Sequence, residues 1–128
     1  MELFFTKRGR GEPLVLLHGL GSSHLDWEEQ LPLLEQHFTV YALDFRGHGR
    51  SPRPDGPYSI PMFAEDVKEL MGHEKIESAI FLGISMGGMV AMQLAVDEPS
   101  KVKKLVLVNT TPEVLIQSKK QKYLLYSR

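Results

Sequence analysis

The sequence contains no cysteine, which excludes disulfide bonds, a thiolate nucleophile and a cysteine-based zinc site. Its five histidines lack the paired spacing of a metal site, so we expect neither a metal ion nor another cofactor. No apolar run approaches the roughly 18 residues of a membrane helix, and no basic leader precedes an apolar stretch at the N-terminus. These absences predict a cytoplasmic protein with no membrane partner.

An excess of charge of one sign is also missing. Fifteen basic and sixteen acidic residues leave a formal net charge of -1. A nucleic acid or an anionic membrane therefore has no electrostatic reason to be the main partner, and a neutral or apolar small molecule fits better. A length of 128 residues, of which 42% are hydrophobic, indicates one domain with one core.

Short apolar runs separated by glycine and proline predict strands that alternate with helices. Two strands, Leu3–Thr6 and Pro13–His18, can form an opening antiparallel hairpin across a polar turn. Because several runs are continuously apolar, we predict a mostly parallel sheet with helices on both faces, an α/β fold. The other predicted strands are Phe38–Leu43, Ala79–Leu82 and Val102–Val108. The predicted helices are one from Ser23 through Leu34 that Pro32 bends or shortens, Met62–Met71 and Gly87–Val96.

A serine stands between a predicted buried strand and a predicted buried helix, in the segment GISMGG. A sharp strand-to-helix turn holds the hydroxyl of Ser85 above the sheet, and glycine at positions 83 and 87 avoids clashes in so tight a bend. The first N–H groups of the following helix and its positive dipole end point at the same place. We predict that Ser85, flanked by Gly83 and Gly87, is a nucleophile; the alternative is a structural turn.

The segment HGLGSS follows another buried strand. Gly19 lets the backbone of this loop approach a substrate closely, so we predict that the N–H groups of Leu20 and Met86 together form an oxyanion hole. His18 invites a catalytic interpretation, but its place at the end of a strand favours a ring that braces the loop through hydrogen bonds.

A third segment, DFRGHGRS, begins at the end of the next predicted strand. It is rich in glycine and in side chains that can bond to backbone groups. None of its residues has a spacing that defines a catalytic role. We therefore predict that Asp44, Arg46 and His48 support the site by bracing a loop on the same side of the sheet.

In this order the three segments resemble the oxyanion loop, the bracing loop and the nucleophile elbow of α/β-hydrolases, and the resemblance spans residues 1–112. It implies an esterase-like reaction on a small-molecule ester: Ser85 attacks, a histidine takes its proton, an acid orients that histidine, and the N–H groups of Leu20 and Met86 bind the oxyanion. Residues 113–128 would begin a lid. A serine at the elbow, rather than an aspartate, argues against the dehalogenase and epoxide-hydrolase branches.

The sequence departs from this family after the elbow. Chain order in the family is nucleophile, acid, histidine, but the last histidine here is His73. The acids that follow Ser85 are Asp97, Glu98 and Glu113, of which Glu113 could stand in as the acid in some variants of the fold. We therefore expect the N-terminal portion of a truncated α/β-hydrolase fold that has little activity alone.

The end of the chain gives two further expectations. Pro112–Arg128 has a pattern typical of a helix with a solvated basic face. The strand Val102–Val108 should have an open outer edge, which the remainder of the same protein or a second copy of the chain would cover.

Two other functions remain open. GLGSSH partly matches a dinucleotide fingerprint, and Asp44 ends the next strand, where a ribose-binding acid would lie; however, His24 replaces the third glycine. A non-catalytic interaction protein on a hydrolase scaffold is the other alternative.

Overall fold

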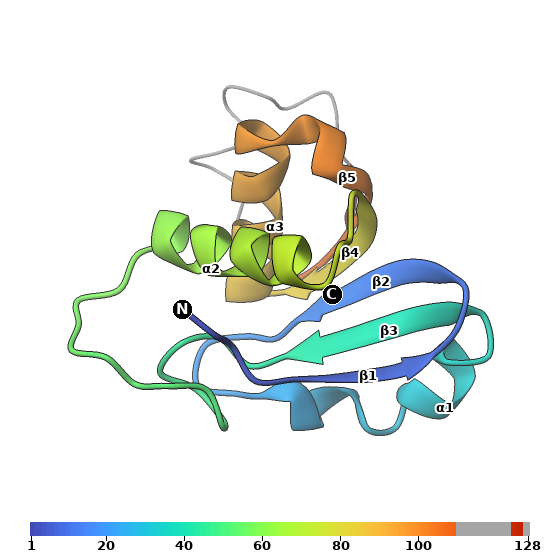
Figure 1. Ribbon diagram of the computed structural model, residues 1–128, viewed down its shortest axis with the longest axis horizontal. Helices are drawn as coiled ribbons and strands as arrows, with labels where there is room; N and C mark the ends of the chain where they lie inside the picture. The colour runs from blue at the N-terminus through green and yellow to red at the C-terminus, as the bar shows by residue number, and fades with distance from the viewer. Residues whose placement is uncertain (110–123, 127–128) are drawn as a thin grey trace.

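The computed structural model describes residues 1–109 and 124–126. Its six strands form a single sheet in the order β1-β3-β2-β4-β5-β6 (Figure 1). Neighbouring strands are parallel except β1 and β3, which are antiparallel. The strands are β1 (Phe5–Gly9), β2 (Glu12–Leu17), β3 (Phe38–Leu43), β4 (Ala79–Ile84), β5 (Val102–Val108) and β6 (Leu124–Tyr126). The predicted α/β fold with a mostly parallel sheet is confirmed.

Helices cover both faces of this sheet. On one face lie α2 (Ile60–His73) and α3 (Met86–Asp97), and on the other lie the 3-10 turn η1 (His24–Trp27) and α1 (Leu31–Leu34) (Figure 1). A second 3-10 turn, η2 (Pro99–Lys101), leads into β5.

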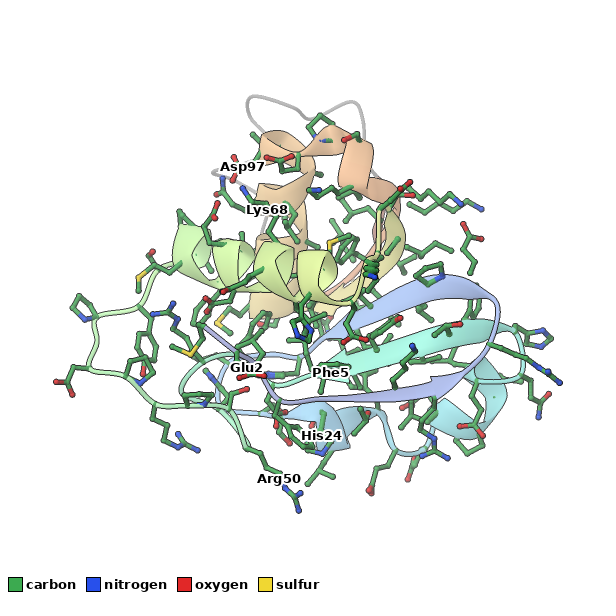
Figure 2. The ribbon with its side chains drawn as sticks, viewed as in Figure 1. Glu2, Phe5, His24, Arg50, Lys68 and Asp97 are labelled. Atoms are coloured by element: carbon green, nitrogen blue, oxygen red, sulfur yellow. The ribbon has the colours of Figure 1, made fainter. Side chains whose placement is uncertain are left out.

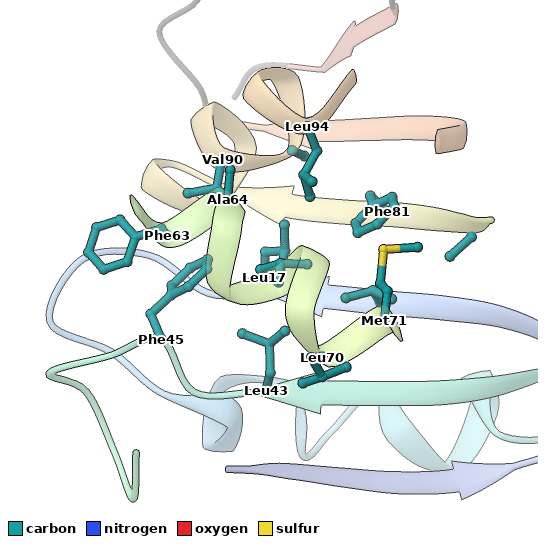
Figure 3. Packing of buried hydrophobic residues seen from close by; sticks show 14 of the residues in the cluster. Leu17, Leu43, Phe45, Phe63, Ala64, Leu70, Met71, Phe81, Val90 and Leu94 are labelled. Atoms are coloured by element: carbon teal, nitrogen blue, oxygen red, sulfur yellow. The ribbon is translucent and has the colours of Figure 1, made fainter. Parts of the chain in front are cut away.

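The larger hydrophobic cluster fills the space between the sheet and the pair α2 and α3 (Figure 3). Val15 and Leu17 of β2 alternate with Leu14 and Leu16, which point to the opposite face and join a smaller cluster around Trp27. A strand with apolar side chains on both faces belongs in the middle of a sheet, and β2 lies there, between β3 and β4. The site described below lies at the carboxyl ends of these central strands.

The predicted hairpin between the first two strands is wrong. β1 pairs with β3, with Phe5 opposite Leu43 and Gly9 opposite Thr39, and β2 lies on the other side of β3. The physical reason is burial. β1 carries polar residues that suit a sheet edge, whereas β2 is apolar on both faces and needs parallel neighbours with helices above and below.

The predicted helix from Ser23 through Leu34 is broken into η1 and α1. Pro32 lies in the first turn of α1, where its missing N–H is no loss. A helix that ran through it from Ser23 would lose a hydrogen bond and place the proline ring against the carbonyl of Glu28. The chain therefore begins a new helix next to the proline.

Two expectations about the end of the chain also need correction. Residues 124–126 form strand β6, not part of a helix, and β6 runs parallel to β5 beside Val106–Val108. This part of β5 is therefore not an open edge. Glu113 and the remainder of the predicted lid, residues 113–123 and 127–128, lie outside the described residues, and the boundary at residue 112 stays a prediction. Among the described residues, no helix has the length and apolar character needed to cross a membrane.

Candidate active site

Ser85 occupies a sharp turn between the last residue of β4 and the first residue of α3. Its backbone has φ 54° and ψ -116°, a conformation that residues other than glycine rarely adopt. The Ser85 N–H donates to the carbonyl oxygen of Val108 at 2.9 Å, which ties the turn to the end of β5. The strand, turn and helix that the sequence predicts around Ser85 are all present.

The two glycines of this turn lie too close to other backbone for any side chain. A Cβ on Gly83 would lie 2.6 Å from backbone atoms of Gly87 and Gly88, and a Cβ on Gly87 would lie 2.1 Å from the carbonyl oxygen of Leu17. These contacts bring the first turn of α3 directly against β4 and the end of β2. The helix N-terminus is thereby fixed beside the serine.

The loop after β2 lies next to this elbow. A Cβ on Gly19 would lie 3.6 Å from the Cβ of Ser85. The Gly19 carbonyl accepts a hydrogen bond from the Ser22 N–H at 3.1 Å, and Gly21 has the positive φ, 76°, that the third position of a type II turn needs. The turn carries the exposed Leu20 at its tip.

The two predicted oxyanion donors come from these two neighbouring segments. Leu20 belongs to the turn after β2, and Met86 is the first residue of α3, where an N–H has no acceptor within the helix. The structure therefore brings both backbones to the carboxyl edge of the sheet beside Ser85. Their role in binding an oxyanion stays a prediction.

The ring of His18 is fully buried beneath this loop, between Gly19 and the start of the next loop. Its Nε2 accepts a hydrogen bond from the Phe45 N–H at 3.1 Å, and its Nδ1 lies 2.7 Å from the Gly19 carbonyl oxygen. A nitrogen that accepts from an N–H carries no proton, so the proton is on Nδ1, which donates to Gly19. Burial lowers the pKa of His18 despite the opposing effect of the Gly19 hydrogen bond. These contacts fit the predicted bracing role.

Asp44 is fully buried at the end of β3, and both of its oxygens accept hydrogen bonds. Oδ1 accepts from the His24 N–H at 2.6 Å, Oδ2 accepts from the Arg50 N–H at 2.9 Å, and the His24 ring Nδ1 lies 2.9 Å from Oδ1. Burial alone would raise the pKa of Asp44, but these bonds together bring it below its ordinary value. Figure 2 shows the side chains of His24 and Arg50 on the same side of the molecule. A Cβ on Gly49 would lie 2.2 Å from Oδ2, so this position of the loop also requires glycine.

Arg46 and His48 hold the next part of the same loop. The Nε and a terminal nitrogen of Arg46 donate to the two oxygens of Asp66 in α2, at 2.7 and 2.9 Å. This side-chain hydrogen bonding raises the pKa of Arg46. The ring Nδ1 of His48 lies 3.0 Å from the Arg46 carbonyl oxygen. The loop is thus fastened to α2 at one point and to the end of β3 at another.

Two partners in this network were missed in the sequence. From the sequence, His24 was considered only as the residue that replaces the third glycine of the dinucleotide fingerprint, and Asp66 was not considered. Asp66 does carry a signal, because it lies among the apolar residues Phe63, Ala64 and Val67 on the buried face of α2. An acid at such a position needs a buried partner.

The described residues place no histidine in the role of a general base. His18, His24 and His48 each use at least one ring nitrogen in the contacts above. His73 ends α2 and His37 precedes β3, so both lie toward the amino ends of the parallel strands, opposite the elbow. A base from another segment is needed for triad chemistry.

The dinucleotide alternative is disfavoured by the same geometry. Both oxygens of Asp44 are occupied by hydrogen bonds and the residue is fully buried, so it cannot reach a ribose. The segment after β2 forms a four-residue 3-10 turn, His24–Trp27, and not the long helix whose N-terminus would bind a pyrophosphate.

The sequence matches the alpha/beta hydrolase fold family over residues 12–126. It is 35% identical over 101 residues to 3-oxoadipate enol-lactonase 2 of Acinetobacter baylyi, covering 79% of this chain and 38% of that protein. It is 34% identical over 114 residues to the soluble epoxide hydrolase of Corynebacterium sp., covering 89% of this chain and 40% of that protein. A solved structure of a marine microorganism esterase has a TM-score of 0.85 and 38% identity, over 94% of this chain and 51% of that chain.

The chain spans between 31% and 46% of the length of the first curated relatives that it matches. The family match nevertheless extends over most of the chain, from the first residue of β2 to the last residue of β6. The match includes all three segments that form the site. The chain belongs to the alpha/beta hydrolase fold family.

Proposed function

We propose that Ser85 is the nucleophile of a serine hydrolase that cleaves an ester or a related acyl bond in a small molecule. The observation that carries this proposal is the backbone of Ser85, held at φ 54° and ψ -116° between β4 and α3. Strained backbone of this kind persists only where the surrounding structure enforces it, and it clusters at functional sites. Here Gly83 and Gly87 permit it, because neither position has room for a side chain.

The chemistry follows from the neighbours of the serine. The Ser85 hydroxyl oxygen attacks the substrate carbonyl carbon, and the hydroxyl proton passes to a general base. The N–H groups of Leu20 and Met86 bind the negative oxygen that develops on the carbonyl. Collapse of this intermediate expels the alcohol, which takes up the proton, and water then hydrolyses the acyl-enzyme. The base and its orienting acid come from outside residues 1–109.

The residue at the elbow favours acyl chemistry over epoxide opening. The relatives include an enol-lactonase and an epoxide hydrolase at nearly the same identity, so overall similarity does not separate the two reactions. A carboxylate nucleophile is typical of the epoxide-hydrolase branch, and position 85 is a serine. A serine forms an acyl-enzyme that water can hydrolyse.

The test is covalent labelling of the purified 128-residue chain with an aryl fluorophosphonate, which reacts with activated serines. We expect slow, stoichiometric modification that peptide mass spectrometry locates at Ser85, and none in Ser85→Ala. Turnover of an activated aryl ester should be small, because loss of a triad member removes several powers of ten in rate. Labelling that is unchanged in Ser85→Ala would show that the nucleophile is elsewhere.

The interaction-protein alternative makes a different prediction for this serine. The same labelling experiment separates the two functions. A non-catalytic scaffold has no reason to keep an oxyanion hole, so its Ser85 should react no faster than an ordinary exposed serine such as Ser100. Preferential labelling of Ser85 favours the hydrolase.

A further inference from the structure

Histidines anchor both ends of the oxyanion loop, residues 19–23. His18 precedes the loop, and its Nε2 accepts the Phe45 N–H at 3.1 Å. His24 follows the loop, and its N–H and Nδ1 lie 2.6 and 2.9 Å from Oδ1 of Asp44. Because Asp44 and Phe45 are consecutive, the loop spans two anchors on one short stretch of backbone at the end of β3.

The first anchor also fixes the orientation of a peptide plane. The Nδ1–H of His18 donates to the Gly19 carbonyl oxygen at 2.7 Å, and the Ser22 N–H donates to the same oxygen at 3.1 Å. The Gly19 carbonyl and the Leu20 N–H belong to one trans peptide, so they point in opposite directions. Holding the oxygen toward the His18 ring therefore turns the Leu20 N–H away from the ring.

We propose that His18 is a positioning residue that sets the direction of the Leu20 N–H, and that protonation of its ring releases one end of the oxyanion loop while the His24 anchor remains. The inference rests on the proposed function, because the direction of this N–H matters only if it binds an oxyanion. It adds to that function a second effect of acid: protonation of His18 weakens the oxyanion hole, independently of any protonation of the catalytic base.

The two anchors respond differently to a proton. A charged imidazole has two donors and no acceptor, so protonated His18 would place an N–H against the N–H of Phe45. An unmade bond between buried donors costs the full desolvation of both groups. The Nδ1–H of His24 instead faces a carboxylate of Asp44, and it can donate in either protonation state. Acid therefore disrupts the first anchor and preserves the second.

The surroundings keep the His18 ring neutral near neutral pH. Burial is the largest cause of its lowered pKa, and the nearby ring of His48, 5.1 Å away between centroids, acts in the same direction. The Gly19 hydrogen bond and the charges of Asp44 and Asp26 oppose this shift without reversing it. The ring therefore becomes charged only as the solution is made acidic.

The first experiment is an NMR titration of the histidine rings in the nitrogen-15-labelled 128-residue chain. We expect His18 to show the Nδ1–H tautomer at neutral pH. Its protonation should coincide with shifts of the Leu20 and Phe45 amide signals, while the His24 amide signal keeps its position. This measurement needs no reaction at Ser85. An Nε2–H tautomer, or a Leu20 amide that ignores the protonation of His18, would overturn the proposal.

The second experiment compares two variants that each keep half of the ring's hydrogen bonding. In His18→Asn the amide nitrogen takes the place of Nδ1 and can still donate to Gly19; in His18→Gln the amide oxygen takes the place of Nε2 and can still accept from Phe45. We expect fluorophosphonate labelling to be slowed on the order of 100-fold in His18→Gln, the size of losing one oxyanion donor. His18→Asn keeps the Gly19 hydrogen bond but lacks the Phe45 anchor. It should therefore react at neutral pH at the slowed rate that the unaltered chain shows in acid, faster than His18→Gln and with no further decline as the pH falls. His73→Asn is the control, and its labelling should follow the unaltered protein.

The outcomes separate this inference from the proposed function. If Ser85 does not label at all but the titration links His18 to Leu20, the hydrolase assignment fails and the anchor stands. If Ser85 labels and the Asn and Gln variants react equally, with an unchanged pH profile, the anchor has no positioning role. Variants that do not fold leave the titration of the unaltered chain to decide.

Discussion

Asp44 accepts hydrogen bonds from two different loops, through the His24 N–H and the Arg50 N–H, and its carboxylate is fully buried. In Asp44→Asn one amide hydrogen must face a donor N–H, because both oxygens now accept. Breaking a buried charge network in this way costs about 3 kcal/mol at neutral pH. Urea unfolding of the variant should show this loss.

The same residue makes stability depend on acid. The pKa of Asp44 is lower in the folded chain than its ordinary value of 3.8, so the unfolded chain binds the proton more readily. This stabilisation is complete above the ordinary value and is lost as the pH falls through the folded pKa. The free energy of unfolding should therefore decline less steeply below about pH 4 in Asp44→Asn than in the unaltered chain.

The exposed Asp97 is the matched control for this experiment. It lies at the end of α3, where it accepts hydrogen bonds from Gln93, one turn earlier. Figure 2 shows it at the opposite end of the molecule from His24 and Arg50. Asp97→Asn should leave both the stability and its acid dependence nearly unchanged. An equal effect of the two substitutions would mean that net charge, not the Asp44 network, governs the acid response.

Among the elements, α2 contacts the loop after β3 through the Arg46–Asp66 ion pair and through Phe63, whose ring packs against Phe45 and His48. Arg46 and Asp66 meet in a bidentate contact that is largely buried, with side-chain exposures of 14% and 4%. Arg46→Lys loses the planar fork, and Asp66→Asn loses the charge. A double-mutant cycle of unfolding free energies should give a coupling of about 2 kcal/mol. The exposed pair of Lys68 with Glu65 should show no measurable coupling.

A coupling near zero for Arg46 and Asp66 would contradict this account, since it would mean that aromatic packing and backbone contacts hold the loop without help from the ion pair. The activity readout is independent. Among the ion pairs of the described residues, Asp66 contacts only Arg46, which belongs to the bracing loop and not to the oxyanion loop. Its substitution should therefore slow Ser85 labelling by less than the His18→Gln variant does.

The elements were predictable where the signal was local. Runs rich in apolar residues identify β3 and β5 to the residue, and the helix predicted over Met62–Met71 lies within α2, which begins two residues earlier and ends two residues later. Such runs do not encode which strands pair. The polar turn after β1 could close a hairpin with β2, so the pairing of β1 with β3 was not predicted. β6 was missed because Leu124–Tyr126 is too short for a period of two to differ from a helical pattern.

The site residues likewise fall into those that a local segment predicts and those that depend on contacts between distant positions. Ser85, Gly83 and Gly87 follow from one short segment whose spacing alone implies the turn. The contacts of Asp44 with His24 and of Arg46 with Asp66 each join positions twenty residues apart, and no local pattern names the partner. Only the buried acid on an otherwise apolar helix face gave a usable sign.

On the scale of the whole molecule, the two faces of the sheet are covered unequally. η1 and α1 cover β2 and β3, but on the same face Leu82 and Ile84 of β4 and their partners Val106 and Val108 of β5 are only half-buried. Apolar side chains that remain in contact with water favour association. We expect the chain to form dimers or larger species as its concentration rises, measured by light scattering after size exclusion.

Val106→Lys should shift this equilibrium toward a 14.5 kDa monomer, because a charge would then lie on the half-covered face. Leu33→Lys is the control. Leu33 is 64% exposed on α1, away from β4 and β5, and its substitution should leave association unchanged. A chain that is monomeric at every concentration would contradict the expectation.

The strained turn at Ser85 lowers the stability of the whole protein. Backbone held in a sparsely populated region costs on the order of 1–3 kcal/mol, and that cost is subtracted from the stability of the entire fold. Glycine escapes the penalty, so Ser85→Gly should be about 1 kcal/mol or more harder to unfold than Ser85→Ala. Thermal denaturation of the two variants measures the difference directly. If glycine proves the more stable, any side chain at position 85 lowers the stability of the fold, so keeping a serine there would exchange stability for the proposed reaction.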